Sequence, residues 1–596
     1  MIEKELKRKK EQKMKYTLRI CGATACRASD SLAVMDKLKQ LIEERKQEFS
    51  DKGIDVEIKE VGCIGLCGKG PLMVVEPCSI LYTNLKVKDV ETIVDSLLNH
   101  RVAENLLYKR DNQSFEKIND VPYYKYQDRF LLRRCGVIEP LSLREYIEND
   151  GFKGLKRALE LNPEEVINEL LKSKLRGRGG AGFPTGLKWK FLRQAQSDVK
   201  FLVCNADEGD PGAFMDRSLL ESDPFAVIEG MLIGAYATGA KKGFIYVREE
   251  YPLASQRIKQ AIKILRENGY LGENIFNKVS FDIKVVEGAG AFVCGEETAL
   301  IKSIEGKRGQ PRVRPPYPAE RGILGKPTNI NNVKTYASVT LIFEKGAEFF
   351  ANLGTENSGG TVVLCLSGDL EDTGIIEVKM GTPLKTVLYD IAGGSRSKKE
   401  LKAVQIGGPL GGLVPKELFD IALDYDSLKE IGSMLGSGGL IALNQDDSIL
   451  KLVSFFLDFL RLESCGQCTP CREGVVQLKK IIDRIINHNA NYEDLDLLNK
   501  LSDYVKNNSL CGLGQGTPNV IESSLRFFIN EYEQKISGPV IYTITDACIG
   551  CHVCAMNCPV QAIEGQPKEK HFIDQSKCIH CGKCFEVCKF NAITKD

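Results

Sequence analysis

Twenty-one cysteines are the residues of this 596-residue chain best suited to chemistry, and most of them stand at short, repeated spacings. Disulfide bonds do not require such spacings, whereas metal and iron–sulfur sites do. Sixteen of the cysteines fall into four sets, which we expect to bind clusters. The other five are Cys78, Cys135, Cys204, Cys294 and Cys365. Cys204 and Cys365 end apolar runs and are expected to be small buried hydrophobic residues.

The eight C-terminal cysteines repeat the pattern C-x2-C-x2-C-x3-C, with Pro559 after the first run and Lys589 after the second. This pattern is typical of ferredoxins with two [4Fe–4S] clusters, in which the fourth cysteine of each run reaches the other cluster. We expect one cluster to be held by Cys548, Cys551, Cys554 and Cys588, and the other by Cys578, Cys581, Cys584 and Cys558. Zinc knuckles are the alternative, disfavoured because each run has four cysteines.

Two further sets suit single clusters. The first has the spacing C-x2-C-x2-C and a remote partner, follows a segment with helical periodicity at 453–460, and suits a [4Fe–4S] cluster: Cys465, Cys468, Cys471 and Cys511. The second combines C-x4-C with C-x3-C in a glycine-rich loop and suits a [2Fe–2S] cluster: Cys21, Cys26, Cys63 and Cys67. Zinc is the alternative at both. A thiol–disulfide enzyme would show C-x-x-C, which the second set lacks.

Between 120 and 450 the chain is poor in cysteine and rich in polar loops. One loop places Gly177, Gly179 and Gly182 at G-x-G-x-x-G spacing, with Arg178 and Lys188 nearby. Helical periodicity at 165–175, not a strand, precedes it, which disfavours a standard dinucleotide-binding unit. Exposed N–H groups and positive charge instead predict a phosphate cradle, with a plain glycine-rich loop as the alternative.

Three further polar loop regions follow or join apolar strands. Residues 204–212 follow a strand at 201–203, residues 287–298 follow one at 281–286, and the loop 311–318 is followed by 326–333. The acidic and amide groups of 204–212 suit sugar hydroxyls or the edge of a flavin ring. Each loop alone is compatible with a turn, but together with the glycine loop they predict an α/β ligand site.

The elements that must position these residues change along the chain. A strand at 16–20, a helix at 31–47 and a strand at 56–61 predict a thioredoxin-like front part. Residues 360–440 alternate short strands (361–367, 403–406) with glycine-rich turns and a helix-like stretch at 384–392. Cysteine-rich helices follow at 446–535, and a linker at Gly538 and Pro539 precedes the C-terminal cysteines.

Composition narrows the class of protein. The net charge of +1 argues against a general nucleic-acid binder. No apolar run reaches the roughly 18 residues of a membrane span, and the lysine-rich start has no apolar segment typical of a secretory signal. We therefore expect a cytoplasmic protein without a membrane span and without a nucleic-acid partner.

Together, these motifs closely resemble the FMN-carrying, NADH-oxidising subunit of respiratory complex I over about 120–535. The front resembles its thioredoxin-like [2Fe–2S] partner subunit, and the tail resembles a two-cluster ferredoxin. This three-part arrangement is similar to the diaphorase (beta) subunits of NAD-linked, electron-bifurcating [FeFe]-hydrogenases and to the equivalent subunits of formate dehydrogenases.

The resemblance implies a multidomain α/β and α+β chain with five parts. These are a thioredoxin-like [2Fe–2S] domain at 1–105, an FMN/NADH-binding α/β domain at 120–350, a small β-grasp-like domain at 355–445, a helical [4Fe–4S] domain at 446–535 and a two-cluster ferredoxin domain at 540–596.

The resemblance also implies roles for single residues. The FMN phosphate and ring would be held by Gly177, Arg178, Gly179 and Lys188, and FMN would be lined by Asn205, Asp207, Glu208, Asn331 and Asn332. Phe183 and Phe191 would stack against the nicotinamide nucleotide, with Glu296 and Glu297 near it. Four further cofactor-binding positions depart from the complex I pattern, which leaves the choice between NAD and NADP open: Asp210 for Glu, Phe292 for Tyr, Arg314 for Lys and Tyr317 for Phe.

The function expected from these features is reversible hydride transfer between NADH and FMN, with electrons then distributed over one [2Fe–2S] and three [4Fe–4S] clusters. A flavin must stand between them because it exchanges electrons both in pairs and singly, and no dedicated acid–base pair is required. The implied partners are a catalytic hydrogenase or formate dehydrogenase subunit, a small thioredoxin-like [2Fe–2S] subunit and ferredoxin. Electron bifurcation rests on the resemblance alone; the alternatives are a non-bifurcating NADH dehydrogenase module and an electron carrier without flavin.

Overall fold

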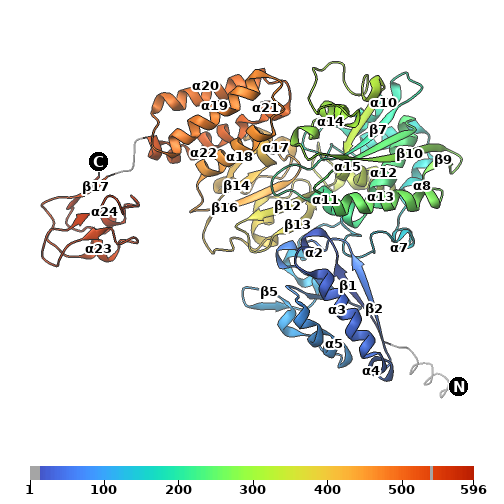
Figure 1. Cartoon of the computed structure of the whole chain (residues 1–596), viewed down its shortest axis with the longest axis horizontal. Coiled ribbons are helices and arrows are strands. Elements are labelled where there is room, and N and C mark those ends of the chain that lie inside the picture. The colour runs from blue at the N-terminus through green and yellow to red at the C-terminus, as the bar shows by residue number, and fades with distance from the viewer. Residues whose placement is uncertain (1–13, 537–540, 596) are drawn as a thin grey trace.

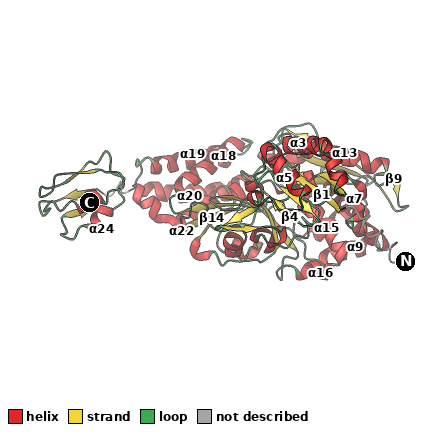
Figure 2. Cartoon of the chain, turned by 90° about the horizontal axis from the view of Figure 1, so that it is seen from below, coloured by secondary structure: helices red, strands yellow, loops and turns green. Residues whose placement is uncertain are grey.

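The computed structural model describes residues 14–536 and 541–595. The lysine-rich start and the linker at Gly538 and Pro539 lie outside these residues. Three sheets and a bundle of helices pack against one another, while the C-terminal part stands apart from them in both views (Figures 1 and 2). The chain combines α/β and α+β parts, as expected from the sequence.

The front part is a four-stranded sheet in the order β2-β1-β3-β4. Strand β1 (Met14–Cys21) is parallel to β2 (Ile54–Val61) and antiparallel to β3 (Met73–Glu76), which pairs with β4 (Ile80–Tyr82). Between β1 and β2 run α3 (Ser31–Glu44) and the short α4 (Lys46–Asp51), where the sequence predicted one helix at 31–47. Helix α5 (Val90–Leu98) packs beside α3. The predicted β-α-β order is confirmed.

The central sheet has the order β11-β7-β8-β10-β9. Strands β7 (Phe201–Ala206), β8 (Lys242–Arg248), β10 (Val279–Gly288) and β11 (Thr328–Asn332) are parallel, and β9 (Gly272–Ile275) is an antiparallel edge. Helix α12 (Pro224–Thr238) is almost wholly buried between this sheet and its neighbours, and it packs on α15 (Val333–Lys345). Parallel strands buried on both faces explain the apolar runs seen in the sequence.

The third sheet has the order β13-β12-β16-β14-β15, with only the β12–β16 pair parallel. Its strands are β12 (Thr361–Gly368), β13 (Gly374–Lys379), β14 (Leu401–Ile406), β15 (Gly412–Pro415) and β16 (Gly439–Asn444). A π-helical turn at Thr386–Ile391 forms where the sequence predicted a helix. A hairpin, a helical crossing and a return strand beside the first strand match the expected β-grasp-like architecture.

Helices α18 (Ile449–Glu463), α19 (Thr469–Ile486), α20 (Tyr492–Asn508) and α22 (Pro518–Ile536) form the bundle, with the short α21 (Gly512–Gly516) at its end. The bundle shares one hydrophobic core with residues from the face of the central sheet and from α14 (Glu297–Ile304). In the C-terminal part, β17 (Tyr542–Ile544) pairs with β20 (Ile593–Lys595), and the short strands Ile563–Glu564 and Phe572–Ile573 pair with each other.

Candidate functional site

The central sheet reverses its strand order beside β7. From β7 the chain proceeds outward through β8 and β10, and then returns to place β11 on the other side of β7. In such sheets ligands bind at the carboxyl ends of the strands that flank this switch point. Asn205 and Asn332 are directly paired at those two ends, so the amides expected to line FMN stand side by side.

The glycine loop lies over this end of β11. It runs between α9 (Pro163–Lys172) and α10 (Thr185–Gln194), so the predicted helix before the loop is confirmed. A Cβ on Gly179 would lie 3.1 Å from Asn332 Cβ, whereas one on Gly177 would meet nothing nearer than Phe183 O at 3.5 Å. The Arg178 amide donates to Thr335 Oγ1 at 2.9 Å and ties the loop to α15.

Lys188 stands in the first turns of α10. Its Nζ donates to Ile330 O at 2.6 Å and pairs with Glu297 on α14. Trp189 donates its Nε1–H to Asn331 Oδ1 at 3.0 Å, which holds that amide at the end of β11. One helix therefore connects the glycine loop to Ile330 and Asn331 of β11 and brings a positive charge to this end of the strand.

The acidic loop after β7 holds a buried carboxylate without a hydrogen-bond partner. Both side-chain oxygens of Asp207 lack one, although Arg248 Nη1 lies 3.9 Å from Oδ1. Burial, with the negative charges of neighbouring carboxylates, raises the pKa of Asp207 to about 7 despite Arg248. Asn205 Oδ1 accepts from the Asp207 amide at 3.0 Å, and its Nδ2 donates to Gly295 O at 3.0 Å.

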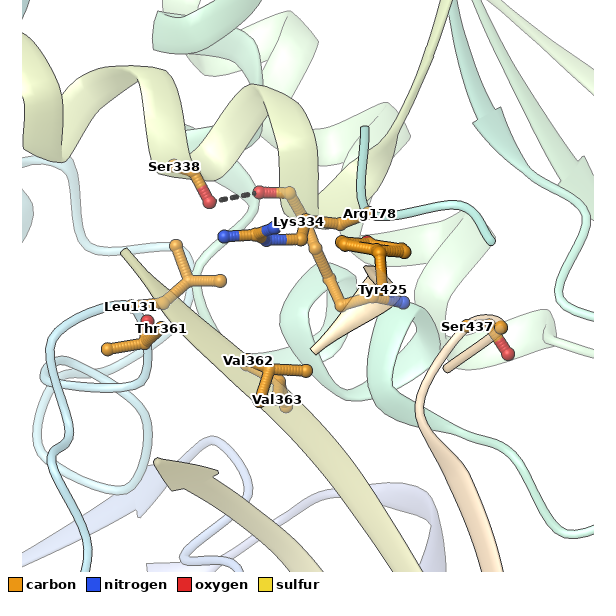
Figure 3. Close-up of a pocket in the computed structure, with 10 residues that line it drawn as sticks. Leu131, Arg178, Lys334, Ser338, Thr361, Val362, Val363, Tyr425 and Ser437 are labelled. Atoms are coloured by element: carbon orange, nitrogen blue, oxygen red, sulfur yellow. Dashed lines mark hydrogen bonds between the residues drawn. The ribbon is translucent and has the colours of Figure 1, made fainter. Parts of the chain in front are cut away.

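Three residues expected at the cofactor have another partner. Arg178 is buried, and its guanidinium points into a small cavity toward Leu131, Ser338 and Thr361, donating to Gly359 O (Figure 3). Glu208 accepts from the first amides of α11 (Met215–Ser222), and burial raises its pKa to about 7. Glu296 caps α14 by accepting from its first amides. Helical periodicity does not reveal such partners, so the sequence did not show these contacts.

The remaining predicted positions lie around the same loops. Asp210 accepts from Ser437 Oγ of the β-grasp-like part, and burial raises its pKa. Phe292 donates its amide to Glu463 Oε2 at 2.8 Å and packs its ring edge-on against Phe459. Three aromatic residues expose about half of their surface, which suits stacking against a nucleotide: Phe183, Phe191 and Tyr317. Arg314 is exposed beside Tyr317.

The [4Fe–4S] cysteines of the bundle meet beside the flavin-site loop. Cys465, Cys468, Cys471 and Cys511 line one cavity, and Val293 and Pro311 line its other wall. Val293 follows Phe292 in the loop after β10, so one short loop touches both the switch-point site and the cysteine cavity. The four cysteines thus line one space, with Val293 and Pro311 as apolar neighbours.

The front cysteines also come together. Cys21 ends β1, Cys26 lies in the short helix α2 (Thr24–Arg27), and Cys63 and Cys67 follow β2 with their sulfur atoms 3.9 Å apart. Hydrogen bonds from Cys26 and Cys63 hold the pKa of the Cys21 thiol well below its ordinary value. Such a close group of thiols, one of them readily ionised, suits a metal cluster.

The two C-terminal cavities divide the cysteines as the crossed pattern predicts. One is lined by Cys548, Cys551, Cys554 and Cys588, and the other by Cys558, Cys578, Cys581 and Cys584. His552 and His571 border the first cavity and are hydrogen-bonded to each other at 2.7 Å. Of the unassigned cysteines, Cys204 and Cys365 are wholly buried, as expected.

The donor groups fit FMN. The Gly177 side of the loop is open to a ligand, Lys188 supplies a cation, and the unpartnered Asp207 carboxyl can meet the N–H and C=O groups of a flavin ring.

Within the described residues, no helix is long and apolar enough to cross a membrane.

Comparisons with known families agree with this geometry. Residues 170–341 match the Nuo51 FMN-binding domain, and 451–535 match the NADH-ubiquinone oxidoreductase-F iron-sulfur binding region. Residues 7–98 match the thioredoxin-like [2Fe-2S] ferredoxin, and 547–592 match a 4Fe-4S dicluster domain. The cofactors of the chain are therefore FMN, a [2Fe–2S] cluster and [4Fe–4S] clusters, with NAD(H) as the fitting substrate, and these matches favour clusters over zinc.

Curated proteins similar to the chain include the NADP-reducing hydrogenase subunit HndC of Solidesulfovibrio fructosivorans, 48% identical over 79% of the chain and 98% of that protein. The NAD-reducing hydrogenase HoxS subunit alpha of Cupriavidus necator is 36% identical over 88% of the chain and 85% of its own length. A crystal structure of an NAD+-reducing [NiFe]-hydrogenase in the H2-reduced state superposes with a TM-score of 0.61 at 28% identity, covering 87% of this chain and 84% of that one. The chain therefore belongs to the family of FMN-binding, NADH-oxidising iron–sulfur subunits that hydrogenases of this type share with NADH-ubiquinone oxidoreductase.

Proposed function

We propose that this chain is the NAD(H)-reactive subunit of a multi-subunit complex and moves electrons between NADH and four iron–sulfur clusters by way of FMN. One observation carries the proposal: the cavity of Cys465, Cys468, Cys471 and Cys511 shares the wall residue Val293 with the loop that lies beside the flavin site. A centre that exchanges single electrons thus adjoins a site suited to hydride transfer.

FMN, when bound, takes up hydride from NADH as an electron pair and releases single electrons to a cluster. The chain's residues bind and orient the reactants. The backbone N–H of Gly179, with the Lys188 cation, would bind the phosphate, and Asn205 and Asp207 would line the ring. The Gly177 N–H donates to Phe183 O at 2.8 Å and closes the loop. Phe183 and Phe191 supply aromatic surface for the nucleotide, and no acid–base pair is needed.

We further propose a cytoplasmic complex in which the partner is a hydrogenase or formate dehydrogenase subunit, assisted by a small thioredoxin-like [2Fe–2S] subunit. The names of the relatives support a hydrogenase, and thiolate-bound clusters suit a reducing compartment. The additional C-terminal part, with two cysteine cavities, favours exchange with ferredoxin and hence electron bifurcation over a plain NADH dehydrogenase module.

The test is purification of the native complex under anaerobic conditions, with flavin and iron analysis and identification of the subunits that purify with the chain. We expect FMN, iron for one [2Fe–2S] and three [4Fe–4S] clusters, and reduction of an artificial dye by NADH. NADPH is assayed in parallel, because one relative is NADP-reducing. Absence of FMN after gentle purification would contradict the proposal.

Bifurcation has its own experiment. If the complex bifurcates, H2 evolution requires NADH and reduced ferredoxin together, and neither donor alone supports it. Evolution of H2 from either donor alone would show an ordinary, non-bifurcating module. An absence of H2 chemistry combined with formate-dependent NAD+ reduction would identify the formate dehydrogenase type of partner.

A further inference from the structure

The loop that carries Cys63 and Cys67 is packed between two other parts of the chain. A Cβ on Gly62 would lie 2.5 Å from Ser222 Cα. Gly65 O accepts from the Ile375 amide at 2.8 Å, and the Gly68 amide donates to Thr373 O at 2.9 Å. Close approach by α11 on one side and by the β12–β13 hairpin on the other explains why this loop is rich in glycine.

Helix α11 provides the first of these contacts with its last two residues. Ser222 Oγ accepts a hydrogen bond from the amide of Cys63 at 2.8 Å, and Ser222 is wholly buried. Glu221, also buried, accepts from the amide of Thr24 at 2.9 Å and from its hydroxyl. Figure 1 shows α11 at the boundary between the central part and α2. A helix of the FMN-binding part thus holds both cysteine-bearing segments of the front part.

The other end of α11 belongs to the flavin site. The Asp216 carboxylate accepts from Lys334 Nζ at 2.7 Å and from Asn332 Nδ2, and Glu208 caps the helix. Eight residues at 1.5 Å each make the helix about 12 Å long. Because the Asp216 end is held by buried polar contacts to flavin-site residues, the helix ties the position of Ser222 to the FMN-binding part.

Ser222 also contacts the buried thiol of Cys135, which no motif assigns. Burial and the charge of Asp223 raise the pKa of Cys135 to about 12, and the hydrogen bond with Ser222 lowers it only in part. The thiol is therefore neutral at pH 7. A hydroxyl oxygen has two lone pairs, so Ser222 can accept from the Cys63 amide while its own proton is directed elsewhere.

We propose that Ser222 is a positioning residue for the [2Fe–2S] cluster: a hydroxyl of the FMN-binding part fixes the main chain of a ligand of the front part. The proposal rests on the assignment of the four front cysteines as cluster ligands. Hydrogen bonds and solvent exposure around the ligands set the reduction potential of an iron–sulfur cluster. Loss of the Ser222 hydroxyl removes the hydrogen bond to the Cys63 amide and loosens the loop. The hydrogen bonding and the solvent exposure of the ligand Cys63 then both change.

The experiment compares the full-length holoprotein with its Ser222→Ala and Ser218→Ala variants. Ser218 is buried one turn earlier on the same helix and serves as the matched control. Electron paramagnetic resonance at a temperature where only the [2Fe–2S] signal persists gives its g-values, and a redox titration gives its midpoint potential. We expect both to shift in Ser222→Ala and to stay at wild-type values in Ser218→Ala. The [4Fe–4S] signals and the FMN content stay unchanged in both.

A second variant, Gly62→Ala, separates the loop from α11 while keeping the hydroxyl, and we expect it to shift the same signal. If Ser222→Ala yields too little folded protein, the g-values and midpoint potential of Gly62→Ala test the role of Ser222 in its place. Wild-type g-values and midpoint in the variants would overturn the role of Ser222. Absence of any [2Fe–2S] signal in the wild type would instead overturn the assignment of the four cysteines, so the two failures are distinguishable.

Discussion

At the scale of single residues, Lys188 is the side chain we expect to contribute most to holding the FMN phosphate. Its Nζ reaches β11 through Ile330 O and α14 through Glu297, so the charge is already fixed at the site. A hydrogen bond to a charged group contributes about 1.5–3 kcal/mol. Lys188→Met should therefore weaken FMN binding roughly 10- to 100-fold.

Fluorescence of the flavin released on dilution gives the dissociation constant. Lys190→Met is the matched control, since Lys190 is exposed on the same helix. FMN binding at wild-type strength in Lys188→Met would remove this lysine from the site.

Asp207 supplies a pH-dependent prediction for flavin-free protein. The pKa of this buried carboxyl is about 7 in the folded chain against about 3.8 ordinarily. Between these values the folded state binds more protons than the unfolded state, so stability falls as the pH rises through this window. Each pKa unit corresponds to 1.36 kcal/mol, which gives a cost on the order of 4 kcal/mol above pH 7.

The substitution Asp207→Asn removes the charge and keeps the shape. Its Tm relative to wild type should be lowest at pH 5, should rise as the pH increases through about 7, and should level off above that value. Thermal unfolding followed at several pH values checks this, and a Tm difference independent of pH would show that Asp207 is ionised throughout.

At the scale of elements, two glycines of the same loop should affect different properties when substituted: one the stability of the folded protein, the other the affinity for FMN. Gly182 has φ +62°, and a Cβ there would lie 2.7 Å from the Tyr425 ring. Gly182→Ala should therefore lower the Tm of flavin-free protein by roughly 2–5 °C. A Cβ on Gly177 meets only Phe183 O at ordinary contact distance, so Gly177→Ala should keep the Tm and weaken FMN binding. Differential scanning fluorimetry and flavin titration together distinguish the two effects, and equal behaviour of both variants would contradict a backbone cradle.

Elements with strong local patterns could be predicted from the sequence. The buried face of α18, with Val453, Phe456, Leu457 and Leu460 all fully buried, follows the helical spacing, and the crossed sharing of C-terminal cysteines follows from the repeat. Local spacing also led to the loops that meet at the carboxyl ends of β7 and β11.

What could not be predicted depends on contacts between distant segments. The glycines at 62, 65 and 68 lie in the loop expected to hold the [2Fe–2S] cluster, and their missing side chains also make room for Ser222, Thr373 and Ile375, which no local pattern indicates. The resemblance implies that Glu208 and Glu296 lie at the cofactor. In the fold Glu208 accepts from the first amides of α11, which begins seven residues further on, and Glu296 is the N-cap of α14 directly before that helix. Only the fold shows which partner an acidic side chain meets.

At the scale of the whole molecule, the described parts differ in how closely they are joined to their neighbours. The bundle shares its hydrophobic core with the central sheet, and the cysteine loop of the front part is enclosed by two neighbours. The C-terminal part has a small core of its own, formed by Ile544, Cys554, Ile563, Cys584 and Ile593. Its cysteine cavities form within 541–595 and use no residue of the other parts.

This separation predicts that a chain ending at residue 536 keeps the flavin-dependent half of the activity. Its reduction of an artificial dye by NADH, its FMN content and the signals of the [2Fe–2S] and bundle [4Fe–4S] clusters should equal those of the full chain, while the iron and signals of the two C-terminal clusters are lost. The paired variant Cys511→Ala in the full chain removes a ligand beside Val293, and should instead lose the bundle cluster and keep the C-terminal ones. Loss of FMN or of dye reduction in the shortened chain would contradict this prediction. It would show that the C-terminal part supports the structure of the flavin site in addition to carrying electrons.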